Sequence, residues 1–328
     1  MIICITGITG FVGSQITRSL HHLGHDLICL VRKKEHVPEE IKDNHKVIAC
    51  DLTKEIDSIE CDLLIHCAAM VSDKTLSFFL NKANIDGTRH VMSAVNPTAK
   101  VIFISCASVY NITQEVHDED EEIIHGLLTP YGRSKLKAEI LLQEEYANRD
   151  IRILRIQNLY GKRARSFLAK LIKIYNNGKV NVPGDLDKSV TLTSIDHLIN
   201  VVQKFITTNW EGTQIYNVVD DHIYNLKEVI LSILSAALNR DVEVNEKSEY
   251  YQRIIAGFRT VLVPGNHITQ NSIDFLSRDH VLSCEKLKTD FHDLISPNFF
   301  DHLDEYRRWL TDNGVSQVLK SSSRIYWT

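Results

Sequence analysis

Short apolar runs alternate with longer amphipathic segments along the first half of the chain. The run IICIT at residues 2–6 is almost continuously apolar, which is typical of a strand buried on both faces of a parallel sheet. Residues 11–23 instead place Val12, Ile16 and Leu20 at the spacing of one helix face. Further strands are predicted at residues 26–31, 46–50, 62–67, 101–105 and 151–155, and further helices at residues 76–95 and 131–146. This alternation predicts an α/β fold in which crossover units build a doubly wound parallel sheet.

The pattern loosens in the second half of the chain, where helical segments are separated by shorter apolar runs. Helical periodicity is present at residues 166–176, 196–207, 226–238 and 299–310, and one of the short runs spans residues 214–219. No long Gly-, Ser- or Pro-rich linker separates the halves, so we expect their elements to interleave. The sequence therefore predicts a first domain at residues 1–160, a smaller lobe at residues 161–320 and a tail at residues 321–328.

The composition is that of an ordinary globular protein, with 44% hydrophobic and 24% charged residues among 328. The net charge of −5 argues against a nucleic-acid-binding protein, which usually carries a basic excess. The apolar stretch at residues 63–71 is far shorter than the ~20 residues needed to cross a bilayer, and we expect no signal peptide before the first strand. We therefore expect a cytoplasmic protein with neither nucleic acid nor membrane as a partner.

The cysteines and histidines indicate no metal site. Seven cysteines without a C-x-x-C pair are typical of buried, reduced thiols in a cytosolic protein. The histidines include no H-E-x-x-H motif, and His21, His22 and His25 are expected to be solvated or to compensate a helix dipole rather than to bind metal. The acidic run DEDEE at residues 118–122 is expected to be a solvated loop, because like charges repel and resist burial.

The strongest local signal is the sequence TGITGFVG at residues 6–13, between the first predicted strand and the first predicted helix. Gly7 allows a tight turn, Gly10 lets the backbone approach a pyrophosphate, and Gly13 lets the helix pack closely on the sheet. A phosphate at this place would meet free N–H groups at the positive end of the helix. The predicted dinucleotide site comprises Gly7, Thr9, Gly10, Phe11, Val12 and Gly13.

The end of the second predicted strand indicates which dinucleotide is bound. An NAD site usually holds the ribose 2′-hydroxyl with an acidic residue at this place. Here the strand ends in Arg32 and Lys33, two cations that would attract a 2′-phosphate. We therefore expect NADP as the cofactor, with NAD as the alternative if both cations are ordinary solvated charges.

A candidate acid–base pair opens the helix predicted at residues 131–146. Tyr131 and Lys135 are four residues apart in the sequence YGRSK and so share a helix face. A phenol titrates at about pH 10, but a cation held close to it favours the phenolate, so that the tyrosine can exchange a proton near neutral pH. The pair therefore predicts proton transfer beside the dinucleotide.

With these motifs the chain resembles the extended branch of the short-chain dehydrogenase/reductase superfamily, which includes nucleotide-sugar epimerases, dehydratases and dihydroflavonol-type reductases. The resemblance covers residues 1–235 and continues more thinly to residue 310. The additional matching segments are Asp51-Leu52, His66-Cys67-Ala68-Ala69, Asn84-Ile85-Asp86-Gly87-Thr88, Ser105-Cys106-Ala107-Ser108-Val109-Tyr110 and Arg155-Ile156-Gln157-Asn158-Leu159-Tyr160-Gly161. The resemblance implies a Rossmann-type fold with a smaller C-terminal lobe that binds the substrate.

The resemblance also implies roles for individual residues. Tyr131 would be the general acid/base, and Lys135 would favour its ionised form and bind the nicotinamide ribose. A hydride would move between C4 of the nicotinamide and a carbinol or carbonyl carbon of a small-molecule substrate. Cofactor contacts are implied for Asp51, Leu52, Cys67, Ala68 and Ala69, and substrate contacts for Ser108 and Asn158. A homodimer is implied through the helices at residues 76–95 and 131–146.

Two positions depart from the family's pattern. Cys106 takes the place of the catalytic Ser or Thr, and a thiol is a weak hydrogen-bond donor. Either the reaction tolerates Cys106, or Ser105 or Ser108 serves instead, or the site is partly degenerate. Val190 stands where the nucleotide-sugar enzymes have an arginine for the diphosphate, which argues against such a substrate.

The sequence is compatible with three different functions. The first is an NADP-dependent oxidoreductase acting on a carbonyl or alcohol, which Arg32, Lys33 and Val190 favour. The second is a nucleotide-sugar epimerase or dehydratase with bound NAD(P), which the segment RIQNLYG at residues 155–161 favours. The third is a cofactor-binding protein with little catalytic activity, for which Cys106 is the only support.

Overall fold

The computed structural model describes residues 1–72, 75–111, 116–161, 164, 175–176, 179–184, 186–247 and 270–313 of the chain. In this part of the chain a central parallel sheet has the strand order β13-β7-β5-β4-β1-β2-β3. Its strands are β1 (Ile2–Thr6), β2 (Asp26–Val31), β3 (Lys46–Ala49), β4 (Leu63–His66), β5 (Lys100–Cys106), β7 (Ile151–Ile156) and β13 (Thr213–Val218). The strands predicted in the first half are therefore confirmed, and the run at residues 214–219 forms an edge of the same sheet.

The strand order reverses beside β1, and this reversal locates a binding crevice. The chain runs outward from β1 through β2 to β3 and then returns to β4 on the other side of β1. The register places Thr6, Leu30 and His66 side by side at the carboxyl ends of these strands. Parallel sheets bind ligands outside the carboxyl ends of their strands at such a switch point. The fold therefore brings the residues that follow β1, β2 and β4 to one edge of the sheet.

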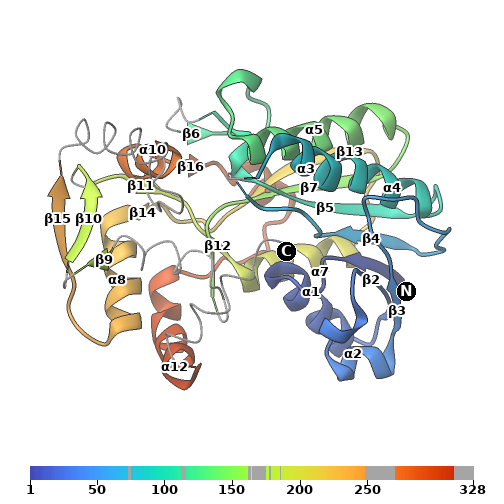
Figure 1. Cartoon of the computed structure of the whole chain (residues 1–328), viewed down its shortest axis with the longest axis horizontal. Helices are drawn as coiled ribbons and strands as arrows, with labels where there is room; N and C mark the ends of the chain where they lie inside the picture. Colours follow the sequence, from blue (N-terminus) through green and yellow to red (C-terminus); the bar gives the residue numbers. More distant parts are fainter. Residues whose placement is uncertain are drawn as a thin grey trace.

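Helices cover both faces of the sheet (Figure 1). One layer contains α1 (Phe11–His22) and α7 (Ile195–Thr207), and the other contains α3 (Ser77–Asn81), α4 (Gly87–Ala94) and α5 (Pro130–Glu145). Ile16 and Leu20 of α1 are buried against the sheet at the spacing of one helix face, as the sequence pattern predicts. These packed layers confirm the Rossmann-type α/β fold.

The helix predicted at residues 76–95 has a wide turn in its middle. A π-helical turn at Lys82–Asp86 joins α3 to α4. Such turns are rare and occur frequently at functional sites. Here the turn carries the buried side chain of Asn84, whose contacts are described with the site.

The smaller lobe lies beside the carboxyl edge of the sheet (Figure 1). In its core, Val229, Ile233 and Leu234 of α8 (Leu226–Leu238) pack against Tyr306 and Trp309 of α12 (Leu303–Asn313). The helices and strands of the described chain that have not yet been given, in either lobe, are α2 (Glu39–Asn44), β6 (Val116–His117), β8 (Leu159–Tyr160), β9 (Tyr175–Asn176), β10 (Lys179–Pro183), β11 (Ser189–Val190), β12 (Thr193–Ser194), β14 (Tyr224–Asn225), β15 (Glu243–Lys247), α10 (Gln270–Ser277), β16 (Val281–Leu282) and α11 (Glu285–Asp290).

Segments from the second half of the chain return to the larger lobe. β13 pairs with β7 along its whole length, and α7 packs beside α1. The domain boundaries at residues 160 and 320 stay predictions. Of the helix predicted at residues 166–176, only residues 175–176 are described, and they form β9 instead of a helix. The tail at residues 321–328 lies outside the described residues.

The acidic run at residues 118–122 is only partly solvated, so the expectation of a wholly solvated loop is wrong. The Glu119 carboxylate is buried and accepts a hydrogen bond from the Asn217 amide at 2.7 Å. The Glu121 carboxylate lies 2.9 Å from Nδ1 of His117, and both side chains are buried. The run follows β6, and alternate carboxylates turn inward to these partners, which offset the expense of burying charge.

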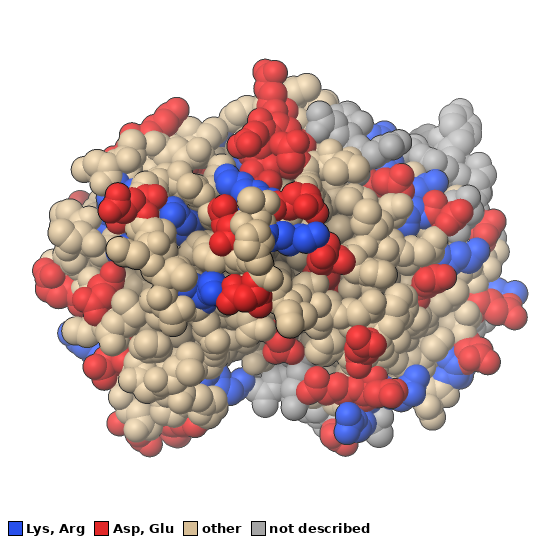
Figure 2. Space-filling model, turned by 180° about the vertical axis from the view of Figure 1, so that it is seen from behind, with Lys and Arg blue, Asp and Glu red and all other residues tan. Residues whose placement is uncertain are grey.

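Figure 2 shows acidic and basic side chains interspersed over the face opposite to that of Figure 1. All seven cysteines are free; Cys4, Cys29, Cys61 and Cys284 are buried and the other three are partly buried. None of the described helices is long and apolar enough to cross a membrane.

A buried ion pair ties α5 to β7 beneath the carboxyl edge of the sheet. The Arg155 guanidinium donates to both carboxylate oxygens of Glu139, with Nη2 at 2.7 Å from Oε2. Nη1 of Arg155 also donates to the Tyr110 hydroxyl at 2.9 Å, and Ser105 donates its hydroxyl proton to Glu139. Both charges are therefore compensated, which a buried pair requires if it is not to destabilise the fold.

We predict that Arg155→Met lowers the free energy of unfolding by about 3–5 kcal/mol, because it leaves the Glu139 carboxylate buried without its cation. The double substitution Glu139→Leu with Arg155→Met removes both charges and should be clearly more stable than the single variant. Urea denaturation of the three proteins measures this difference. A double variant as unstable as Arg155→Met would contradict the charge argument.

Candidate active site

The glycine turn after β1 packs against the loop after β4, and the fit leaves no room for side chains. Gly7 has a φ of +73°, and a Cβ atom there would lie 2.7 Å from the Ala68 nitrogen. A Cβ atom on Gly13 would lie 2.2 Å from the Gly7 carbonyl oxygen. Glycine at these two positions therefore allows the turn, α1 and the residues Cys67 and Ala68 to meet, as a dinucleotide site requires.

The N-terminus of α1 offers backbone donors to an anion. Gly10 is the N-cap residue and provides no side-chain acceptor for the amides of the first turn. The helix begins directly after β1, so its positive end lies at the carboxyl edge of the sheet. Thr9, Phe11 and Val12 lie in or beside this turn, Thr9 exposed and the other two half-buried. The residues present therefore fit a pyrophosphate.

A buried histidine fixes the ends of β1 and β4. Nδ1 of His66 lies 2.7 Å from the Thr6 hydroxyl, and Nε2 lies 3.0 Å from the Thr88 hydroxyl. The Thr6 hydroxyl also accepts the amide proton of Ala68 at 3.0 Å. Burial lowers the pKa of His66 to about 3, so the ring is a neutral structural group near neutral pH. The loop Cys67-Ala68-Ala69 is held in place by this arrangement.

Asn84 joins that loop to the helix that carries Tyr131. Its Oδ1 accepts from the Met70 amide at 2.7 Å, and its Nδ2 donates to the Met70 carbonyl and to the Ser134 hydroxyl. The Ser134 hydroxyl in turn donates to the carbonyl of Tyr131. The sequence places Asn84 in a family motif but does not assign it this role. The role depends on the π-helical turn, which only the structure shows.

Cations line a pocket at the end of β2. Arg32 and Lys33 follow the strand, as predicted. An open cavity of about 460 Å³ is lined by Arg32, Lys33, Lys34, Glu35, His36 and Ala49. A phosphate in this cavity would meet several positive charges, whereas a hydroxyl would gain little from them.

Asp51 and Leu52, two of the cofactor contacts that the resemblance implies, follow Ala49 of this pocket closely in the chain. Hydrogen bonds from Thr53, with a smaller contribution from Arg32, hold the pKa of Asp51 below its usual range. The carbonyl of Leu52 accepts from Nδ1 of His90 at 2.9 Å. Asp51 is exposed and charged, while Leu52 is tied to α4, so their contact with a cofactor stays a prediction.

A second close approach assembles the catalytic candidates. A Cβ atom on Gly132 would lie 1.9 Å from the carbonyl oxygen of Ser108, so α5 reaches the end of β5 only because residue 132 is glycine. At this contact the Cys106 thiol lies close enough to Tyr131 and Ser108 for both to act on its pKa. The structure therefore brings Tyr131, Cys106 and Ser108 close together, while their roles stay predictions.

Lys135 lies one helical turn further along α5 and is fully buried. Its Nζ donates to the Ile104 carbonyl at 2.8 Å and lies 3.9 Å from the centre of the Phe103 ring. Burial lowers the pKa of Lys135 to about 8, although Cys106 and Glu139 oppose the shift. The ammonium group therefore loses its charge within a pH unit or so of neutrality.

The structure narrows the alternatives for Cys106. Burial raises the pKa of the Cys106 thiol, which Lys135 only partly opposes, so the group is a neutral, weak donor. Ser105 is buried and its hydroxyl donates to Glu139, away from the site. Ser108 is exposed and contacts Cys106. Of the two neighbouring serines, only Ser108 has a hydroxyl on the side of Tyr131.

Asn158 presents an unsatisfied donor close to these groups. It follows β7, in which Ile156 pairs with Cys106 of β5, and it has a φ of +42°. Its Nδ2 is buried and has no hydrogen-bond partner among the described residues. An unpaired buried donor is destabilising by about 1–3 kcal/mol. An acceptor on a bound molecule would satisfy it, which fits the predicted substrate contact.

Comparisons with known proteins identify the family and the fold of this chain. A model of the NAD dependent epimerase/dehydratase family matches residues 3–219. N-acetyl-alpha-D-glucosaminyl-diphospho-ditrans,octacis-undecaprenol 4-epimerase from Escherichia coli O157:H7 is 27% identical over 165 residues, 48% of this chain and 49% of the relative. dTDP-4-dehydro-6-deoxy-D-allose reductase from Streptomyces bikiniensis is 22% identical over 63% of this chain and 72% of the relative.

Solved structures show the likeness of fold over nearly the whole chain. UDP-glucuronic acid 4-epimerase from Bacillus cereus in complex with NAD has a TM-score of 0.73 at 19% identity, over 97% of this chain and 99% of that one. The terminal R domain from the myxalamid PKS-NRPS biosynthetic pathway has a TM-score of 0.74 at 17% identity, over 95% and 91%. The chain spans about half the length of the first curated relatives it matches. Because the family model covers about two thirds of its 328 residues, the chain belongs to the NAD dependent epimerase/dehydratase family.

Proposed function

We propose that the protein is an NAD(P)-dependent oxidoreductase that acts on a carbonyl or alcohol group of a small molecule. The observation that carries the proposal is the contact between Tyr131 and Cys106 beside the buried cation Lys135. This group lies at the same sheet edge as the glycine turn that fits a pyrophosphate. When bound, the dinucleotide supplies or accepts the hydride.

The proton chemistry falls to this chain's own side chains. In the direction of reduction, the Tyr131 hydroxyl gives its proton to the substrate oxygen, and the Lys135 charge stabilises the phenolate that remains. The Cys106 thiol can donate only weakly to the same oxygen. The hydroxyl of Ser108, in contact with the thiol, is the stronger donor and supports the polarisation of the substrate.

Substrate positioning is assigned to Asn158 and to the smaller lobe. The unsatisfied Nδ2 of Asn158 supports a hydrogen bond to a substrate acceptor. The lobe packs beside the carboxyl edge of the sheet, where it can close over a ligand (Figure 1). We retain the division into a cofactor domain at residues 1–160 and a substrate lobe at residues 161–320 as part of this proposal.

NADP is the proposed cofactor, and the pocket of Arg32 and Lys33 supports it. NAD is the alternative, because the structures similar in fold include NAD complexes, such as UDP-glucuronic acid 4-epimerase from Bacillus cereus. Both dinucleotides would use the glycine turn, so the choice depends on the charges at the end of β2.

A nucleotide-sugar epimerase or dehydratase is the second candidate. The names of several relatives favour it, among them UDP-glucose 4-epimerase from Bacillus subtilis. Against it, Val190 is buried in β11, where it pairs with Tyr224. A buried valine cannot hold a diphosphate, so the arginine contact of the nucleotide-sugar enzymes would have to come from another residue. The third reading, a cofactor-binding protein with little activity, rests on Cys106 alone.

A second copy of the chain is the proposed protein partner. At the start of α3, Leu76, Phe78 and Phe79 are exposed by 70%, 68% and 50%. Exposed apolar side chains grouped on one helix support a protein contact, and this helix is one of the two that the family resemblance implies for a homodimer. A cytoplasmic location stays a prediction of the sequence.

The central test compares Tyr131→Phe with Tyr146→Phe, a matched loss of one phenolic hydroxyl at the far end of α5. We expect Tyr131→Phe to lower the rate of NADPH oxidation by carbonyl substrates roughly 100- to 10,000-fold, because the general acid is lost. NADPH affinity, measured by fluorescence titration, should change less than about threefold, and the control should keep the wild-type rate.

Two outcomes would contradict the reductase. Product formation from nucleotide sugars without net consumption of NADPH would identify an epimerase or dehydratase. Cofactor binding without turnover in a broad panel of carbonyl compounds and nucleotide sugars, unchanged in Tyr131→Phe, would identify a binding protein.

The cofactor preference is tested by Arg32→Ala. We expect the NADPH affinity to fall about tenfold or more, because a hydrogen bond to a charged group contributes about 1.5–3 kcal/mol. The NADH affinity should remain unchanged. Lys42→Ala is the control, since it removes the same charge from α2, where Lys42 pairs with Glu39. Equal losses for NADPH and NADH would show that Arg32 does not read the 2′-phosphate.

The pH profile tests the role of Lys135. Its pKa of about 8 means that the ammonium is charged below that pH and neutral above it. We therefore expect kcat/KM, which reports groups of the free enzyme, to fall as the pH rises through about 8. Lys137→Met, which alters an exposed lysine of the same helix, should keep this alkaline limb. A flat wild-type profile between pH 7 and 9 would contradict the assignment.

A further inference from the structure

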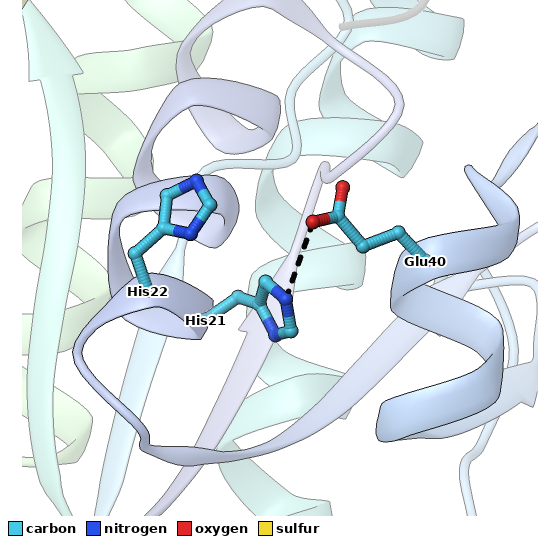
Figure 3. Close-up of side chains that lie close together, drawn as sticks. All are labelled: His21, His22 and Glu40. Carbon is cyan, nitrogen blue, oxygen red and sulfur yellow. Dashed lines mark ion pairs between the residues drawn. The ribbon is translucent and has the colours of Figure 1, made fainter.

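Two histidines and a carboxylate meet between the end of α1 and the start of α2. His21 and His22 are in the last turn of α1, and Glu40 is in the first turn of α2. Figure 3 shows the Glu40 carboxylate turned across the gap between the two helices toward the histidine rings. One ligand atom of each residue lies within 4.8 Å of the ligand atoms of the other two. We propose that His21, His22 and Glu40 form a binding site for a divalent transition-metal ion of the zinc type.

The distances suit tetrahedral zinc. Zinc bonds to histidine nitrogen and carboxylate oxygen are about 2.0–2.2 Å long, so neighbouring ligand atoms of a tetrahedron lie about 3.3 Å apart. Nε2 of His21 and Oε1 of Glu40 are 3.3 Å apart. Two of the three ligand atoms therefore already have the required spacing. His22 is exposed at the helix end and reaches the ion by a side-chain rotation, leaving the fourth position to water.

A third histidine orients the first. Nδ1 of His21 lies 2.9 Å from Nε2 of His45, and the two rings meet edge to face. Metal-binding histidines usually have their second nitrogen held by such a partner, which fixes the ring orientation. His45 follows α2 directly, so the same segment supplies both the carboxylate and the orienting ring.

The hydrogen bonds predict what the ion would change. His45 Nδ1 accepts from the Leu27 amide at 3.4 Å, so its Nε2 carries the proton and donates to His21. The His21 proton is then on Nε2, facing Glu40. An ion on Nε2 of His21 requires the proton on Nδ1 instead, and His45 must switch its proton from Nε2 to Nδ1. Each ring keeps one proton, and the cost falls on the contact with Leu27, where two N–H donors then face each other.

The surrounding charges favour a cation. The site lies at the C-terminal end of α1, where the backbone carbonyls carry partial negative charge, and Glu40 adds a full negative charge. A second group, Asp221, Cys284 and Glu285, also has ligand-like spacing. There, however, Nζ of Lys288 already lies 3.0 Å from both carboxylates and neutralises them. The histidine site is therefore the stronger of the two.

The position of the site gives the ion a physical consequence. In the segment after β2, His36 is the last residue that lines the pocket of Arg32, and α2 begins shortly after it at Glu39. An ion held by α1 and α2 would add a second tie between residues 32–38 and the larger lobe, beside the burial of Val37 and Ile41 in its core. The proposal itself concerns binding of the ion and does not depend on the reaction that the protein catalyses.

The test measures zinc binding to untagged protein that has first been freed of metal with a chelator. Titration with zinc against a chromogenic competitor is compared for the wild type, His22→Ala and Glu40→Gln, with His25→Ala as the matched control. We expect either ligand variant to weaken the site about tenfold or more and His25→Ala to leave it unchanged. Equal zinc affinity in the wild type and both ligand variants would overturn the proposal, as would the absence of binding.

A second measurement separates liganding by His21 from zinc bound at one of the seven thiols. Nitrogen-15 NMR of histidine side chains should show the proton of His45 on Nε2 without zinc and on Nδ1 with zinc. Zinc saturation without this switch would overturn the assignment of Nε2 of His21 as a ligand.

Discussion

The close approach of α5 to the end of β5 is the constraint on which the site depends. The two backbones meet where Gly132 faces the carbonyl of Ser108, at a separation that no side chain would permit. A shift of α5 away from this contact would move Tyr131 from Cys106 and Lys135 from Ile104, because all are held along the same helix and strand. Proton transfer requires atoms within hydrogen-bond reach, so the proposed proton transfer by Tyr131 depends on this packing contact.

Several buried polar groups fasten the same helix in its place. Asn84 holds the first turn of α5 to the loop after β4, and Arg155 holds Glu139, one turn beyond Lys135, to β7. Lys135, Glu139 and Arg155 thus alternate in sign from the site into the core. Buried charges are tolerated when each has a partner in reach. The alternation lets the protein bury the Lys135 cation without an uncompensated charge beneath it.

The part of the proposed cofactor site beside β2 differs from the part beside α5. The segment that follows β2 is polar and open, and it carries the cations proposed to read a 2′-phosphate. It leads into α2, which buries Ile41 in the core of the larger lobe and places Glu40 beside His21. An ion bound there would add a polar tie to this apolar anchor, whereas the helix α5 is already held by paired buried charges.

The sequence by itself determined the alternation of strands and helices, the glycine turn and the spacing of Tyr131 and Lys135. These features depend on local periodicity and sterics, which neighbouring residues specify. Only the tertiary structure decided that Asn84 spans to Ser134, that Glu139 pairs with Arg155, that Glu119 is buried and that Glu40 faces His21. Each of these depends on a partner far along the chain, and a polar side chain reads as solvated until the fold supplies that partner.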